Sequence, residues 1–126
     1  MFLRFTTTSV DKGSRKPEGI FAAGYRLLDS GELDSAEWKQ LRELMDWFNA
    51  QLPKPPESFE AARAVFWFRS TAAECISRIW EMVFILREHG HHVLVHKCDH
   101  LANVCYRDRV QVAAYPSVRD GRTTVQ

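Results

Sequence analysis

The stretch that decides the fold is residues 63–90, RAVFWFRSTAAECISRIWEMVFILREHG. Its first seven residues are rich in aromatic and β-branched side chains, and the run is short enough for a strand. After Ser70 and Thr71, apolar residues recur at helical spacing up to Gly90, which is the expected left-handed stop. Thr71 and Glu74 fit a capping box at the start of this helix. The stretch therefore predicts a core strand that leads directly into a long, largely buried helix.

Length and composition indicate a single globular domain. A chain of 126 residues is long enough to bury one core without disulfides or structural metals. Its hydrophobic fraction of 45% and charged fraction of 26% are close to ordinary globular values, which argues against disorder. We expect the domain to span residues 1–116 and residues 117–126 to form a flexible tail.

Charge and cysteine usage narrow the expected partners and compartment. A net charge of +1 argues against binding to polymeric nucleic acid, which usually needs a strong basic excess. No apolar run approaches the roughly 20 residues that a membrane-spanning helix requires, so no membrane partner is expected. The three cysteines are scattered without CxxC spacing, which favours reduced thiols. We therefore expect a cytoplasmic protein.

The segments before the central stretch predict one strand and two helices. In residues 2–10, apolar and polar side chains fall on alternate faces, as in a strand. Pro17 suits the first position of a helix. Asp34 and Glu37 form a second capping-box pattern, and the prolines of residues 53–56 end the helix that follows. The expected buried faces are Ile20, Ala23, Gly24, Leu27 and Leu28 in the first helix, and Trp38, Leu41, Met45, Phe48 and Leu52 in the second.

The segments after Gly90 predict three strands, at residues 91–98, 103–106 and 109–115, with Arg107 and Asp108 as the connection of the last two. The complete order is β-α-α-β-α-β-β-β. This order predicts an α+β domain, with a mostly antiparallel sheet of about five strands and three helices packed on one face.

The strand-to-helix step of the central stretch is the first candidate site. A charged group, two hydroxyls and the free N–H groups of the following helix together suit a phosphate or carboxylate, and an indole adds a stacking surface. The ordinary alternative is a hydroxyl that caps the helix beside a solvated arginine. The candidate ligand-binding residues at this step are Trp67, Arg69, Ser70 and Thr71.

Basic residues near the last hairpin are the second candidate. Lys97, Arg107 and Arg109, with Arg4 alongside, could line a groove in which Tyr106 stacks on a base. Charges on a solvated strand face are the alternative. The basic loop at residues 11–17 is either a solvated connector or a lid over an anionic ligand.

Histidines and a cysteine suggest the third candidate, a metal site. His92, His96 and Cys98 fall on one face of a strand and, with His100 and Asp99, supply zinc-type ligands. Same-face strand residues splay apart, however, and no tight ligand knuckle is present. A metal-dependent enzyme is therefore the alternative function, with solvent-facing or interface histidines as the ordinary explanation.

Recognised catalytic motifs are missing from the sequence. It contains no Walker A loop, Rossmann glycine pattern, G-x-S-x-G elbow or HExxH motif. This favours a binding protein over an enzyme, and we expect no cofactor. A plain protein-interaction domain without a small ligand is a further alternative.

Four phrases carry a resemblance to a known family. They are residues 17–25 (PEGIFAAGY), 47–53 (WFNAQLP), 67–80 and 110–116 (VQVAAYP). Together they resemble a family of small prokaryotic and prophage proteins and are similar to the phage-encoded Thoeris anti-defence proteins of the first type. The resemblance implies a compact homo-oligomer that sequesters cyclic ADP-ribose-type signals or cyclic oligonucleotides without cleaving them. No site residue is carried over from it.

Overall fold

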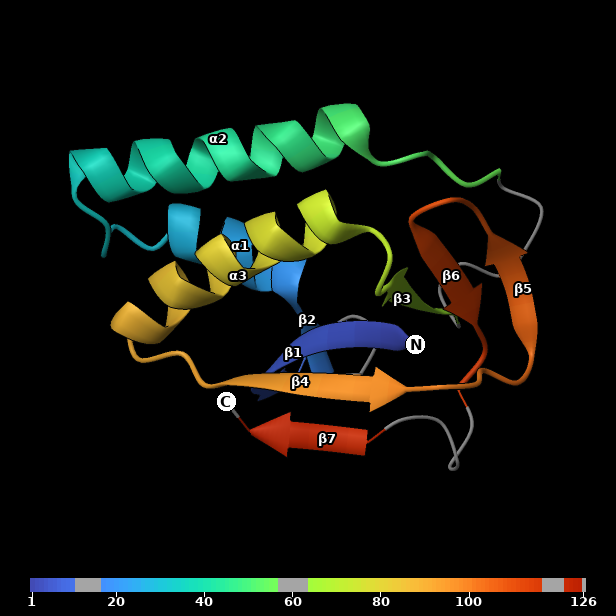
Figure 1. The fold of residues 1–126 in the computed structure, drawn as a ribbon. Helices are drawn as coiled ribbons and strands as arrows, with labels where there is room; N and C mark the ends of the chain where they lie inside the picture. The colour runs from blue at the N-terminus through green and yellow to red at the C-terminus, as the bar shows by residue number, and fades with distance from the viewer. Residues whose placement is uncertain (11–16, 57–63, 117–121, 126) are drawn as a thin grey trace.

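Three helices cover one face of an antiparallel sheet in the computed structural model, which describes residues 1–10, 17–56, 64–116 and 122–125 (Figure 1). The α+β class and the predicted order of helices and main strands are therefore confirmed. The strands are β1 Phe2–Val10, β2 Pro17–Gly19, β3 Val65–Arg69, β4 Val93–Cys98, β5 Val104–Arg107, β6 Gln111–Ala114 and β7 Arg122–Val125.

The sheet has the strand order β5-β6-β3-β1-β4-β7, and β2 pairs with β1 outside this path. Each pairing among the described strands is antiparallel. The additional strands relative to the expected five are β2 and β7. Residues 122–125 lie in the range predicted to be a tail but pair with β4, and the domain boundary at residue 116 stays a prediction.

The helices are α1 Ile20–Leu28, α2 Ser35–Gln51 and α3 Ala73–Glu88. α1 contacts β1 and β2, and α3 contacts β4, while α2 covers both helices and lies farthest from the sheet (Figure 1). The predicted capping box of Asp34 and Glu37 starts α2, with both reciprocal hydrogen bonds present. Gly90 follows the end of α3 with a φ of 81°, a conformation that favours glycine.

Two predicted helix starts are wrong. Pro17 does not begin α1, because residues 17–19 pair with β1 as the short strand β2. Thr71 does not cap α3, because the N-cap residue is Ala72 and no side chain bonds to the free N–H groups there. Ser70 and Thr71 instead form an exposed turn between strand and helix.

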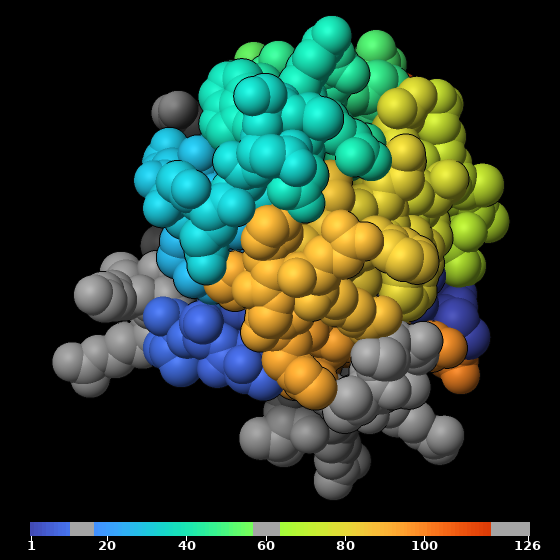
Figure 2. Space-filling model, turned by 90° about the vertical axis from the view of Figure 1, so that its left-hand side faces the viewer, coloured from blue at the N-terminus to red at the C-terminus, as the bar shows by residue number. Residues whose placement is uncertain are grey.

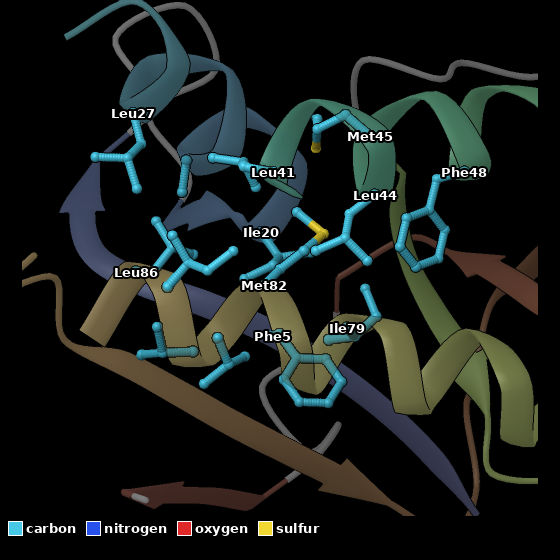
Figure 3. Close-up of a cluster of buried hydrophobic side chains, with 14 of the residues drawn as sticks. Phe5, Ile20, Leu27, Leu41, Leu44, Met45, Phe48, Ile79, Met82 and Leu86 are labelled. Atoms are coloured by element: carbon cyan, nitrogen blue, oxygen red, sulfur yellow. The ribbon is translucent and has the colours of Figure 1, made fainter. Parts of the chain in front are cut away.

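The main core lies between the helices and the sheet. Side chains from all three helices and from β1 point toward one another there (Figure 3). Ile79, Met82 and Leu86 of α3 are fully buried, and burial of each such side chain contributes about 1.5–3 kcal/mol. All five predicted apolar residues of α1 are buried. In α2, Leu41, Met45 and Phe48 are buried as predicted, whereas Trp38 is 45% exposed.

A second apolar cluster lies on the opposite face of the sheet. Its position follows from strand alternation, because Phe68 packs under the helices while its neighbour Trp67 belongs to the second cluster. The buried members are Trp67, Cys98, Leu101, Val112 and Ala114. Both faces of the central strands are therefore apolar at this end of the sheet.

Histidine–glutamate contacts join the start of α2 and the residues just before it to the end of α3. His89 Nε2 lies 2.8 Å from Glu37 Oε2, and His91 Nε2 lies 3.8 Å from Glu32 Oε2. Figure 2 shows this end of the molecule, where the surface around the start of α2 (cyan) abuts the surface at the end of α3 (gold). The hydrogen bond to Glu37 raises the pKa of His89. Two chain segments far apart in sequence are thus joined by a titratable contact.

This contact predicts a pH-dependent difference in stability between the wild type and His89→Gln. Because the pKa is raised in the folded state, the stabilisation is fully present below the ordinary histidine pKa of about 6.5. It is lost as the pH rises through the higher folded value. We expect the wild type to have the higher Tm at pH 6 and the difference to disappear by about pH 9. Thermal unfolding of both proteins at both pH values measures this difference in Tm.

Glu37→Gln is the matched control for this prediction. A glutamine can still close the capping box with Asp34 but carries no charge for the imidazolium. In the Glu37→Gln background, the difference in Tm caused by His89→Gln should no longer depend on pH. A wild-type advantage that persists at pH 9 would contradict the assignment.

Candidate ligand-binding site

Two strands share one edge of β1, and this arrangement creates a fork in the sheet. β3 pairs with the start of β1, where Leu3 opposes Phe68, and β2 pairs farther along, where Thr6 opposes Gly19. The other edge of β1 is continuously paired with β4. Residues 4–5 therefore lie at the fork, and their register partners are in β4 alone.

A buried carboxylate fixes the β2 side of the fork. Glu18 of β2 accepts hydrogen bonds from Arg26 of α1 at 2.8 Å through both of its oxygens, and from Thr7 Oγ1 of β1 at 2.7 Å. The hydrogen bond from Arg26 is the main reason that the pKa of Glu18 is lowered, although burial opposes it. One side chain therefore ties the short strand both to its neighbour and to the following helix.

A cavity of about 610 Å³ opens at the fork. Its described walls come from β1, β2, β3, the first turn of α1, the end of α2 and residues 52–55. Residues from both faces of the sheet contribute, since Phe68 faces the helices and Trp67 faces away from them. The aromatic side chains of the lining are Phe5, Phe21, Phe48, Phe66, Trp67 and Phe68.

The polar side chains of the described lining are two cations, Arg4 and Lys54, and two amides, Asn49 and Gln111. Neither aspartate nor glutamate occurs among the lining residues that the structure describes. Arg4 is partly buried, and it has no hydrogen-bond or ion-pair partner in the described part of the chain. Burial lowers the pKa of Arg4, because the charged guanidinium is incompletely hydrated. The wall of the cavity thus carries a desolvated positive charge.

The N-terminus of α1 adds to this positive character. Its N-cap residue is Gly19, which supplies no side-chain acceptor, and the first helical residues, 20–22, all line the cavity. The first N–H groups of a helix lack partners within it, and the helix dipole places partial positive charge at this end. The start of α1 and Arg4 thus both add positive character to the cavity wall.

The size and lining match those of small-molecule sites. Such sites are clefts of about 300–1,000 Å³ with apolar, aromatic walls and few polar groups. No protein-family model, curated protein or solved structure matches this chain. Aromatic walls with an arginine and a lysine are chemically suited to a molecule with a flat apolar part and a negative charge.

Of the candidate residues predicted at the strand-to-helix step, some line the cavity and others do not. Trp67 lines the cavity, whereas Ser70 and Thr71 are exposed. Arg69 donates from Nε to the carbonyl oxygen of Asp108 at 2.7 Å, and its guanidinium lies 6.0 Å from the ring centroid of Phe2. Arg69 thus holds the β5–β6 connection against β3.

The predicted hairpin residues gather around Asp108. Tyr106 donates its hydroxyl hydrogen to Asp108 at 2.6 Å, while Arg107 and Arg109 are exposed. The charge of Arg109 acts on Cys75 in the first turn of α3, where burial is the main cause of a raised cysteine pKa. Arg69, Tyr106 and Arg109 are therefore brought to one end of the sheet, but none of the three lines the cavity.

The histidine row is not assembled into a ligand set. His92 is exposed, His96 Nε2 bonds to Thr6 Oγ1 at 2.7 Å, and Cys98 Sγ donates to the His100 carbonyl at 2.8 Å. Among the described residues, no group of three or more His, Cys, Asp or Glu side chains is arranged to hold a metal ion.

Two other predictions concern a lid and a membrane span. The basic loop of residues 11–16 lies outside the described residues, so its role as a lid stays a prediction. None of the helices in the described ranges has the length and apolar character needed to cross a bilayer.

Sequence reasoning missed the cavity itself. The sequence pattern groups Arg4 with a basic row on the terminal strands and gives no reason to select Gly19 or Lys54. A fork depends on which strands share an edge, and a three-residue strand carries no periodic signal. The proline-rich residues 53–56, which mark an extended segment beside the sheet, were the available hint.

Proposed function

We propose that this protein is a non-catalytic binding protein that holds a small anionic ligand with a flat aromatic part, of the nucleotide type, in the cavity at the fork. The observation that carries the proposal is the partly buried, unpartnered Arg4 in the wall of an aromatic cavity. Leaving a cation in such a position costs free energy unless an anion compensates it.

The cavity combines groups that suit a phosphate with aromatic side chains that suit a base, which supports a nucleotide-like ligand. A guanidinium and the N-terminus of α1 suit a phosphate, while Phe21, Phe66 and Trp67 provide surfaces on which a base can stack. The remaining polar groups of the described lining are a lysine and two amides, which hold a ligand rather than activate it. Capture without turnover fits this set best.

The more specific form of the proposal is a sponge for cyclic ADP-ribose-type signals or cyclic oligonucleotides, acting against host defence in the cytoplasm. It rests on the sequence resemblance to phage anti-defence proteins. Homo-oligomerisation is part of the same proposal, and it is supported by apolar surface on α3, where Phe84 is 71% exposed. Native mass spectrometry of purified protein measures the oligomeric state and the mass of any bound ligand together.

Ligand capture is tested with cyclic ADP-ribose isomers and cyclic oligonucleotides. Each is incubated with the protein, unbound ligand is removed, and heat releases what was held. Recovery of intact ligand is the expected result. Anilinonaphthalene sulfonate is an aromatic anion whose fluorescence rises in apolar surroundings. A candidate ligand that binds in the cavity should displace this dye and lower its fluorescence. Recovery of a degraded ligand would overturn the non-catalytic proposal, and failure of every candidate and of the dye to bind would overturn the binding site.

Gly19 offers a way to fill the cavity without straining the fold. Its φ of −74° suits any residue, and a Cβ added there meets no atom within 4 Å. We expect Gly19→Leu to weaken dye binding at least tenfold by occupying ligand space, while unfolding free energy changes by no more than about 1 kcal/mol at this N-cap position. Fluorescence titration and chemical denaturation measure the two effects.

Gly19→Ala is the matched control, because it changes the same backbone position but fills little volume. It should bind the dye nearly as well as the wild type. Equal loss of binding in both variants would mean that the helix start, rather than cavity volume, is responsible.

A further inference from the structure

The fork places one residue of β1 between two strand pairings. The β1–β3 ladder ends at the pair of Leu3 and Phe68, and the β1–β2 pairing begins at Thr6 and Gly19. Phe5 lies between these two points, and neither pairing includes it. Its register partner among the described strands is in β4, on the other edge. Phe5 is thus the residue at which this edge of β1 passes from one neighbour to the next.

Strand alternation gives the direction of the main-chain N–H of Phe5. Ser70 donates its main-chain hydrogen to the carbonyl of Met1 at 3.0 Å, so this carbonyl points toward β3. The direction of the main-chain groups alternates along an antiparallel strand, and Leu3 and Phe5 therefore share it with Met1. The next bond of the ladder would join the Phe5 N–H to the carbonyl of Phe66, but the ladder has already ended. The Phe5 N–H therefore points into the gap between β1 and β3.

The cavity occupies the same gap. Arg4 and Phe5 line it from β1, and residues 65–68 line it from β3. Phe5 is 2% exposed, so its N–H has little contact with bulk solvent. Within the described ranges, no hydrogen bond satisfies this N–H, and native structures rarely leave such a donor unsatisfied. It is therefore a donor that a ligand in the cavity can use.

We propose that the Phe5 N–H recognises the edge of the ligand's flat part by donating a hydrogen bond to an acceptor atom in the ring plane. This inference rests on the proposed function, because it requires an aromatic anion in the cavity. It narrows the ligand class to planar heterocycles that carry an acceptor on their edge, as nucleobases do. The aromatic walls stack equally well on a plain hydrocarbon ring of the same shape, so the N–H supplies the discrimination between the two.

The side-chain amides of the described lining are less suited to this role. Gln111 uses both of its amide hydrogens, toward the carbonyl of Pro53 at 3.1 Å and the carboxylate of Asp108 at 3.2 Å. Asn49 is exposed, and its amide donates to the hydroxyl of Tyr25 at 2.9 Å. The two cations of the lining suit the anionic group of the ligand instead.

Matched aromatic sulfonates test the proposal on the wild-type chain. Quinoline and isoquinoline sulfonates share the shape and charge of naphthalene sulfonate but carry a ring nitrogen that accepts a hydrogen bond. Each competes with anilinonaphthalene sulfonate in a fluorescence titration at alkaline pH, where the ring nitrogen has no proton. We expect at least one positional isomer to bind about two- to tenfold more tightly than naphthalene sulfonate. Without a donor, burial of the nitrogen would weaken binding instead.

The NMR signal of the Phe5 amide provides a second measurement on the wild type. The preferred isomer should move this proton resonance downfield, as hydrogen bonding does, whereas naphthalene sulfonate should not.

A main-chain variant isolates the Phe5 N–H. Phenyllactic acid at position 5 keeps the benzyl side chain and replaces the preceding amide by an ester, which has no N–H. We expect this protein to lose the preference for the heterocycle. The same replacement of Phe2, which is outside the described lining, should keep the preference. Trp67→Phe removes the indole N–H, another donor in the wall, and should keep the ratio of the two affinities.

The possible results separate the inference from the proposed function. Equal binding of naphthalene sulfonate and every isomer would overturn recognition by Phe5 but leave the binding site standing. A preference that survives the ester at position 5 would overturn it too, because another donor would then be responsible. Absence of binding by the dye and by every sulfonate would overturn the proposed function and the inference with it. Should the ester protein fail to fold, the isomer comparison and the Phe5 amide signal of the wild type decide.

Discussion

Arg4→Met is expected to weaken binding of anilinonaphthalene sulfonate by roughly 30- to 1,000-fold, which corresponds to about 2–4 kcal/mol. The guanidinium is partly buried, so its charge acts on a bound anion with less solvent screening than a surface arginine would. Methionine keeps a long apolar side chain in the wall and removes only the charge and the donors. Equilibrium fluorescence titration gives the affinity.

The same substitution should leave the free energy of unfolding unchanged or slightly raise it. Arg4 has no ion-pair partner among the described residues to lose, and the variant no longer desolvates a charge. Loss of binding together with unchanged or higher stability distinguishes a ligand group from a structural one. Arg107→Met, at an exposed position that sequence reasoning favoured, is the control and should bind as the wild type does. The reverse ranking of the two variants would place the site at the hairpin.

Asp108→Ala is expected to lower the free energy of unfolding by about 2–4 kcal/mol and Tm by on the order of 10 °C. The carboxylate accepts four hydrogen bonds: from the Tyr106 hydroxyl, the backbone N–H groups of Val110 and Gln111, and the side-chain amide of Gln111. Alanine leaves all four donors without this acceptor, and Gln111 is only 6% exposed. Chemical and thermal denaturation measure the loss.

The pH dependence of this effect has a defined sign. Burial alone would raise the pKa of Asp108, but its hydrogen bonds from Tyr106, Val110 and Gln111 outweigh burial and lower it. Its contribution is therefore present above the unfolded value of about 3.9 and is lost as the pH falls through the lower folded value. The wild type and Asp108→Ala should converge in stability in strong acid.

Asp46→Ala is a suitable control for Asp108→Ala. Asp46 pairs with Arg42 on the exposed side of α2, where the loss should stay below about 1 kcal/mol. A comparable loss in both variants would contradict the role of Asp108 as the centre of the β5–β6 connection.

The parts of the fold with a periodic signal could be predicted from the sequence. The apolar spacing of α1, the capping box at Asp34 and the stop at Gly90 each depend on neighbours within a few residues, and each is found in the structure. Helix starts were harder, because Pro17 is equally acceptable in a short strand and Thr71 can lie in a turn. At both places contacts distant in sequence decide the outcome.

The candidate site was only partly predictable. Trp67 is among the candidate residues that the sequence indicates and it lines the cavity, but the cavity itself depends on the shared edge of β1. The predicted anion site combined the free N–H groups of α3 with a basic residue, and the start of α1, which has no side-chain cap, lies in the same cavity wall as Arg4. Whether such a helix start lies beside a cavity depends on the strand arrangement, which local sequence patterns do not contain.

Gln111 has a consequence for how ligand occupancy can be observed. Its side-chain amide lines the cavity, donates to the carbonyl of Pro53 at 3.1 Å, and shares the carboxylate of Asp108 with Tyr106. The cavity rim and the β5–β6 connection are therefore one hydrogen-bonded unit. A fluorinated tyrosine at position 106 would serve as a remote spectroscopic reporter, sensing a filled cavity without touching the ligand.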